Sequence, residues 1–175
     1  MQRASIGDFL LLNTAHFDKL SMYNFSTVYP SVCRLELNPK SKREGGDIAF
    51  HFPDKNKLFV TWGELENARK KFATLEEYAE SSITVVKKTA KKFERETPSS
   101  ITVNSHNAIY NQTSVSEKPT GLFGGGGHPV KHGTYSVHMY CEKSSRFFVI
   151  YALFGVSEES FKEVFMKMVN SFRCH

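Results

Sequence analysis

Residues 135–154 read YSVHMYCEKSSRFFVIYALF, and this stretch decides the fold. Apolar residues fill every second position of its first part, a period of two that predicts a β-strand, and they are Tyr135, Val137, Met139 and Cys141. Residues 142–145 are turn formers, and residues 147–154 are nearly all apolar, as expected of a central strand that is covered on both faces. The stretch therefore predicts an antiparallel hairpin in the middle of a sheet.

The same period of two recurs on the N-terminal side of this hairpin. Residues 33–37 alternate and predict a half-buried strand. Two pairs of such runs are separated by short turn-rich segments and predict hairpins: residues 48–52 with 58–62, and residues 101–103 with 108–115. Because hairpin-length links join neighbouring strands in opposite directions, the sheet is expected to be mainly antiparallel.

Two amphipathic helices are predicted between and after these strands. Thr74 and Glu77 have the spacing of a capping box, and an apolar stripe continues from there to Phe93, before Pro98. A second stripe runs from Ser157, the expected N-cap, to Phe172. The fold class is therefore α+β, a mostly antiparallel sheet of about six to seven strands flanked by two amphipathic helices.

Length and composition fit one domain over residues 1–175, with 40% hydrophobic and 13% aromatic residues to fill a core. Two segments carry no firm periodicity. Residues 1–24 are an N-terminal segment of uncertain structure, and residues 116–133 are a glycine-rich loop between two strands. A loop of that length is usually functional or mobile.

The three cysteines are Cys33, Cys141 and Cys174, an odd number at wide spacing. This pattern is no disulfide framework and suits a reducing compartment, and Cys174 is expected to be the most exposed of the three. No leader pattern and no run of apolar residues long enough for a membrane span is found. The sequence therefore predicts a cytoplasmic protein that does not insert into a membrane.

Five stretches spread over residues 25–173 follow one another in a characteristic order, and they are residues 25–30, 58–62, 74–79, 103–108 and 146–151. This order resembles that of the PsbP-like superfamily. The superfamily unites the photosystem II extrinsic PsbP proteins, a Ran-binding nuclear import factor of fungi, and bacterial and archaeal proteins of unknown role. The resemblance implies α/β/α layers and a bias toward binding or assembly over catalysis.

The glycine-rich loop holds most of the candidate ligand-binding or partner-binding residues, namely Gly124, Gly125, Gly126, Gly127, His128, Lys131 and His132. A phosphate-binding loop needs a Gly-Lys-Ser/Thr end and a following helix, and this segment has neither, so a flexible link is the favoured interpretation. Trp62 is the remaining candidate, either a core residue, which is favoured, or the rim of a pocket.

Metal and catalytic chemistry have weaker support. His128, His132 and His138 are weak metal candidates, because glycines and Pro129 oppose the helix that would bring two of them together. No nucleophile motif is present, so no catalytic residue, metal or cofactor is expected, and an enzyme is disfavoured.

The net charge of +5 points to acidic partners only if the cations cluster. Lys87, Lys88, Lys91 and Lys92 form the densest basic patch, but no exposed aromatic residues accompany it, so nucleic acid is allowed but not favoured. The expected function is a non-catalytic binding or interaction module with a protein or small-molecule partner. The alternatives are a small enzyme or metal-binding protein using the Gly/His loop and a binder of acidic partners. A homo-oligomer that pairs sheet edges stays open.

Overall fold

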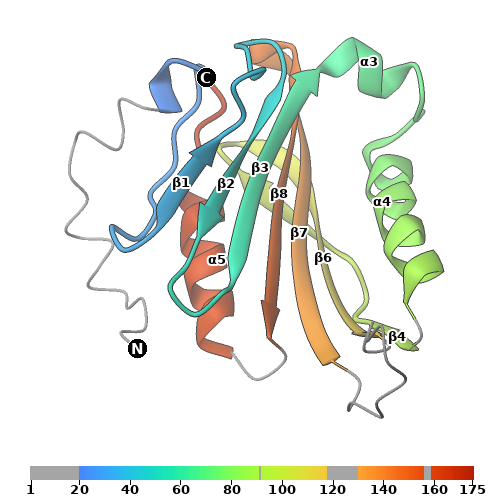
Figure 1. Ribbon diagram of the computed structural model, residues 1–175. Helices are drawn as coiled ribbons and strands as arrows, with labels where there is room; N and C mark the ends of the chain where they lie inside the picture. Colours follow the sequence, from blue (N-terminus) through green and yellow to red (C-terminus); the bar gives the residue numbers. More distant parts are fainter. Residues whose placement is uncertain (1–19, 91, 118–129, 156–158) are drawn as a thin grey trace.

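Eight strands form one antiparallel sheet in the computed structural model, which describes residues 20–90, 92–117, 130–155 and 159–175 (Figure 1). The order across the sheet is β1-β2-β3-β8-β7-β6-β4, and β5 pairs with β6 beside β4. The strands are β1 (Arg34–Leu37), β2 (Gly46–His51), β3 (Lys57–Glu64), β4 (Lys92–Arg95), β5 (Ser99–Val103), β6 (His106–Glu117), β7 (Val130–Cys141) and β8 (Arg146–Gly155). The helices are α3 (Leu65–Arg69), α4 (Leu75–Thr89) and α5 (Glu159–Ser171).

The predicted α+β class is confirmed, with slightly more strands than expected. All three predicted hairpins form, β2 with β3, β5 with β6 and β7 with β8. The additional strand is β4, where the sequence pattern predicts the end of a helix. Instead α4 ends at Thr89, Ala90 is extended, and Phe93 pairs with Val115 of β6. Lys92 and Glu94 are exposed while Phe93 and Arg95 are half-buried, so pairing with β6 overrides a helical pattern that is only local.

One face of the sheet carries the hydrophobic core. α5 and residues 20–30 pack against it, and Phe148 at its centre lies 5.1 Å from Phe172 between ring centroids. The predicted apolar stripe of α5 is confirmed, because Phe161, Val164, Phe165, Met168 and Val169 are all buried in this core. Ser157, the expected N-cap, lies outside the described residues.

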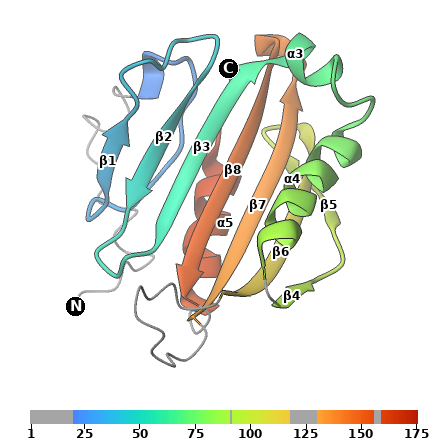
Figure 2. The same cartoon turned by 45° about the vertical axis from the view of Figure 1, so that its right-hand side comes forward.

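α4 lies on the other face. Its N-cap is confirmed, since the Thr74 hydroxyl accepts from the Glu77 amide at 3.1 Å, and the Glu77 carboxylate accepts from the Ala73 amide. The helix contacts β6 and β7, as Figure 2 shows, whereas the short α3 contacts β3 and β8 at the end of the sheet where β3 leads into it. β8 is therefore buried on its core face but only half-buried at Phe147, Val149, Tyr151 and Leu153. The expectation that this strand is covered on both faces is wrong.

The C-terminal segment is fixed to the sheet. Arg173 exchanges two backbone hydrogen bonds with Ser26, and Arg146 donates to the carbonyl oxygen of Cys174 at 3.0 Å. Cys174 is 0% exposed and forms a disulfide bond with Cys141. The expectations of an exposed Cys174 and of no disulfide are therefore wrong, because folding brings together two cysteines that are 33 positions apart.

Among the described residues, no helix combines the length and the apolar character that crossing a membrane requires.

Candidate functional site

A cleft of about 440 Å³ lies between α4 and the uncovered part of the sheet. Its volume falls in the range of pockets that hold small organic molecules. The α4 wall is formed by Tyr78, Ser82, Ile83 and Val86, and the sheet wall by Asp47, Phe59, Thr61, Thr134, Ser136, His138, Val149 and Tyr151. Most of this lining is apolar. By contrast, a larger hollow of about 600 Å³ beside α3 is lined chiefly by charged side chains.

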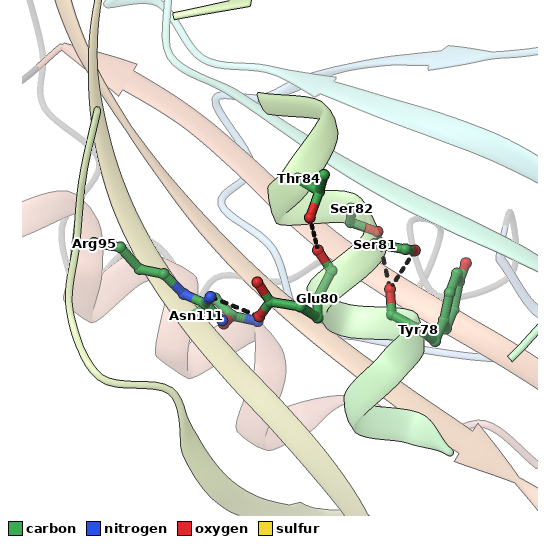
Figure 3. A network of polar contacts seen from close by, with 7 residues as sticks. All are labelled: Tyr78, Glu80, Ser81, Ser82, Thr84, Arg95 and Asn111. Atoms are coloured by element: carbon green, nitrogen blue, oxygen red, sulfur yellow. Dashed lines mark hydrogen bonds and ion pairs between the residues drawn. The ribbon is translucent and has the colours of Figure 1, made fainter. Parts of the chain in front are cut away.

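Figure 3 shows the polar contact that joins α4 to β4, together with side-chain hydrogen bonds inside the helix. Arg95 of β4 donates to the Glu80 carboxylate at 2.6 Å and to the Asn111 side-chain oxygen of β6, also at 2.6 Å. Ser81 and Thr84 donate to backbone carbonyls within the helix. Because α4 lies over β6 and β7, with β4 beyond β6 and β8 beyond β7, the Arg95–Glu80 ion pair fixes the helix on its β4 side while the cleft opens toward β8.

His138 lies at the base of the cleft and is 0% exposed. Its Nε2 lies 3.1 Å from the Ser82 hydroxyl, and its ring packs at nearly a right angle to the Tyr78 ring, with 5.2 Å between centroids. Within the described part of the chain, neither His138 Nδ1 nor the Ser136 hydroxyl has a hydrogen-bond partner. Unpartnered buried polar atoms are uncommon and call for an explanation, such as a bound ligand or water.

The burial of His138 predicts a pH dependence of stability. Burial lowers its pKa from 6.5 to about 4, so the unfolded chain binds a proton more readily than the folded one. The contribution of His138 to the free energy of unfolding is therefore complete well above pH 6.5. It is lost as the pH drops through 6.5 toward 4, and the loss amounts to up to about 3 kcal/mol. The pKa of His106 is also lowered, first by burial and then by the charge of His175. His106 therefore contributes to the pH dependence of stability in the same direction as His138.

Urea denaturation at a series of pH values measures this effect. His138→Gln is expected to flatten the profile, and His106→Gln is expected to change it less. A wild-type profile that stays level through this interval would contradict the assignment.

No family model and no curated protein sequence matches the chain. Solved structures do. The solution structure of cyanobacterial PsbP from Synechocystis sp. matches with a TM-score of 0.57 and 11% identity, over 87% of this chain and 88% of that one. The Saccharomyces cerevisiae Ran-binding protein Mog1p matches with a TM-score of 0.54 and 10% identity, over 86% of this chain and 89% of that one. The chain has the PsbP/Mog1 fold.

A Bacteroides thetaiotaomicron structure also has this fold, with a TM-score of 0.53 and 9% identity, over 86% of this chain but 45% of that one. The resemblance predicted from the sequence is thereby confirmed at the level of the PsbP/Mog1 fold. At identities near one residue in ten, the likeness carries the architecture and not an activity.

The PsbP/Mog1 fold buries Trp62 instead of placing it at a rim. The side chain is 2% exposed, packs on Tyr23 and Phe25 at 5.0 Å between ring centroids, and donates from Nε1 to the carbonyl oxygen of Lys42. Trp62 is therefore a core residue, as favoured from the sequence, and does not line the cleft.

The candidates of the glycine-rich loop fall in two groups. Gly124, Gly125, Gly126, Gly127 and His128 lie outside the described residues. Lys131 is exposed and His132 half-buried, both on β7. His132 and His138 are six positions apart on this extended strand, a separation of about 20 Å, so these two do not share one ion.

The four lysines of the basic patch do not share one helix. Lys87 and Lys88 lie in the last turn of α4, Lys92 lies on β4 and pairs with Glu94 at 2.8 Å, and Lys91 is outside the described residues. An exposed pair of this kind contributes little to stability. The helical patch expected from the sequence is therefore divided between two elements.

The cleft itself is not among the sequence candidates. Its lining comes from α4 and four strands, and Val149 and Tyr151 were assigned to a fully covered strand. One signal was present in the sequence: α4 places Ser81 and Ser82 beside the apolar Ile83, and β7 places Ser136 and His138 on the face opposite its apolar residues. Polar residues on both surfaces predict an incompletely packed contact.

Proposed function

We propose that this chain is a non-catalytic binding module whose α4 cleft holds a small, mostly apolar molecule carrying one hydrogen-bonding group. The observation that carries the proposal is the combination of an apolar cleft with two unpartnered polar atoms at its base, His138 Nδ1 and the Ser136 hydroxyl. Apolar walls with few placed polar groups are typical of small-molecule sites.

The wall chemistry gives each part of such a ligand a role. Phe59 and Tyr151 lie side by side at 6.2 Å between ring centroids and are half-buried, so they offer apolar contact at the mouth. Because His138 is 0% exposed and Ser136 4%, a ligand bonds to their polar atoms once the Tyr78 ring, which packs against the His138 ring, moves aside. Its polar group then satisfies atoms that otherwise stay unpartnered, which costs about 1–3 kcal/mol for each such atom.

Binding is favoured over catalysis by the surroundings of His138. The Ser82 hydroxyl and His138 Nε2 form the kind of pair that nucleophilic catalysis uses. Such a pair also requires a third group that orients the imidazole through its other nitrogen. His138 Nδ1 has no such partner in the described part of the chain.

The similarity of fold to a known binding protein supports a binding function for this chain. One of the similar structures is a Ran-binding protein, which lends support to a protein partner in general. The apolar lining of the cleft favours a small organic ligand, because sites for such molecules are concave and mostly apolar.

A dye-binding experiment tests the cleft with a matched pair of variants. Val86 lines the cleft, whereas its neighbour Val85 is 65% exposed. Val86→Trp fills the cleft and is expected to weaken binding of anilinonaphthalene sulfonate at least about tenfold, or about 1.4 kcal/mol. Val85→Trp adds the same side chain outside the cleft and is expected to bind the dye like the wild type. Fluorescence titration measures both affinities.

Circular dichroism shows whether each variant is folded, since loosened cores also bind this dye. Equal affinities of the two folded variants, or no dye binding by the wild type, would refute the assignment of the cleft as the binding site.

A further inference from the structure

Four side chains with sulfur or imidazole ligand atoms meet at one end of the sheet, away from the cleft. His106 begins β6, Cys141 ends β7, and Cys174 and His175 follow α5. The two figures that show the whole fold place the C-terminus at the same end of the sheet as the link between β7 and β8 (Figures 1 and 2). Three separate parts of the chain therefore supply this Cys/His cluster.

Each part is held in place by backbone structure. Ala108 pairs with Met139, and continuing this register two positions places His106 opposite Cys141. The turn before His106 is tight, with positive φ at Asn104 and Ser105. The hydrogen bonds of Arg173 with Ser26, and of Arg146 with the Cys174 carbonyl, fix the third part.

Ring nitrogens of both histidines face the sulfur atoms. Cys141 Sγ lies 3.7 Å from His106 Nε2 and 3.5 Å from His175 Nδ1, and Cys174 Sγ lies 3.2 Å from His175 Nδ1. All four ligand atoms lie within 4.8 Å of one another. A structural disulfide needs no imidazole neighbours, so the disulfide alone leaves the position of the two histidines without a role.

We propose that, when Cys141 and Cys174 are in the dithiol state, these four residues form a tetrahedral Cys₂His₂ site for Zn²⁺. With Zn–S bonds of about 2.3 Å and Zn–N bonds of about 2.05 Å, the sulfur-to-nitrogen edges of such a tetrahedron measure about 3.5 Å, and its sulfur-to-sulfur edge about 3.8 Å. Three of the sulfur-to-nitrogen distances, 3.7, 3.5 and 3.2 Å, already lie close to this edge. The two sulfur atoms, bonded in the disulfide, have to separate.

The disulfide state and the zinc-bound state exclude each other, and a balanced reduction connects them. A dithiol reductant gives two electrons and two protons to the Cys141–Cys174 bond and itself becomes a disulfide. The two thiols then bind Zn²⁺ as thiolates and release two protons, while each neutral imidazole donates a nitrogen lone pair. The same four positions therefore hold either a disulfide or a metal ion.

The ligand set selects the metal and its role. Two thiolates and two imidazoles in a tetrahedron are typical of zinc. Four protein ligands leave no position for water or substrate, so the site is structural. Asn104 adds a polar neighbour, since its side-chain nitrogen lies 3.7 Å from Cys174 Sγ, where it can steady a thiolate.

Cobalt substitution tests the site. The full chain is reduced with a phosphine under argon, the phosphine is removed, and Co²⁺ is added. The wild type is expected to bind one equivalent, with sulfur-to-cobalt charge-transfer absorption and the strong visible bands of tetrahedral Co²⁺, and Zn²⁺ is expected to displace it. The protein that has not been reduced is expected to show neither absorption.

Variants identify the ligands. His175 is exposed, so His175→Ala is expected to keep the fold. The substitution is expected to weaken Co²⁺ binding more than about 100-fold, which exceeds the loss caused by replacing a residue that only supports a ligand. Cys33→Ser removes the free cysteine outside the cluster and His132→Ala a histidine outside it, and both are expected to bind like the wild type. A folded, reduced wild type without the charge-transfer absorption would overturn the proposal, as would binding that His175→Ala retains.

Discussion

Replacing Arg146 by methionine is expected to lower the free energy of unfolding by more than about 3 kcal/mol. The side chain is 4% exposed, and its guanidinium donates to four backbone carbonyl oxygens, those of Tyr23, Asn24, Arg43 and Cys174. Methionine keeps much of the volume but leaves these acceptors without donors. The bonds to Tyr23 and Cys174 are buried and the other two are partly buried, so the cost is about 1–3 kcal/mol for each acceptor that water does not reach.

Arg146 is unusual because its guanidinium donates to carbonyl oxygens and, in the described part of the chain, forms no ion pair with a carboxylate. Its guanidinium also lies over the Phe148 ring, 4.8 Å from the centroid. Burial, and then the nearby Arg43, lower its pKa, yet an arginine stays protonated in proteins.

Urea denaturation measures the loss for Arg146→Met. Arg34 is exposed on β1, and Arg34→Met is the matched control, expected to change the free energy of unfolding by less than about 0.5 kcal/mol. Equal effects of the two substitutions would show that the carbonyl contacts of Arg146 do not stabilise the fold.

Reduction of the Cys141–Cys174 bond is expected to cost about 3–4 kcal/mol in metal-free buffer. The bond closes a loop between residues 33 positions apart, so its loss frees the unfolded chain more than it changes the folded one. Urea denaturation with and without a phosphine reductant, both with a chelator present, measures the difference.

Cys33→Ser serves as the control for this reduction, because Cys33 is buried and takes no part in the bond. The variant is expected to show the same difference between the two conditions as the wild type. A difference that disappears in Cys33→Ser, or that is absent in the wild type, would contradict the prediction.

Much of the fold could be predicted because its signals are local. The hairpin of residues 135–154 alternates strictly on one strand and is apolar throughout the next, and the Thr74 cap depends on two residues three positions apart. Where a local pattern was compatible with both a helix and a strand, pairing with a strand distant in sequence determined which of the two forms. Phe93 extends the helical stripe of α4, yet β6 pairs with it as β4.

The sites could not be predicted for the same reason. The cleft exists because α4 covers β6 and β7 but not β8, and no spacing along the sequence encodes that offset. The Cys/His cluster joins residues 106, 141, 174 and 175, and its ends are 69 positions apart (175 − 106). The sequence pattern did not single out His106 or His175 and predicted an exposed Cys174, because the contacts of Arg146 and Ser26 cannot be deduced from sequence.

The two edges of the sheet have a consequence for solubility. β1 has four residues, and the opposite edge is divided into β4 and β5 on either side of residues 96–98. A long exposed edge accepts strands from other molecules and can start the growth of fibrils. Proline has no amide hydrogen to donate to an incoming strand, so the break at Pro98 interrupts the ladder that such growth requires. The interrupted edge therefore protects this sheet against aggregation by strand addition.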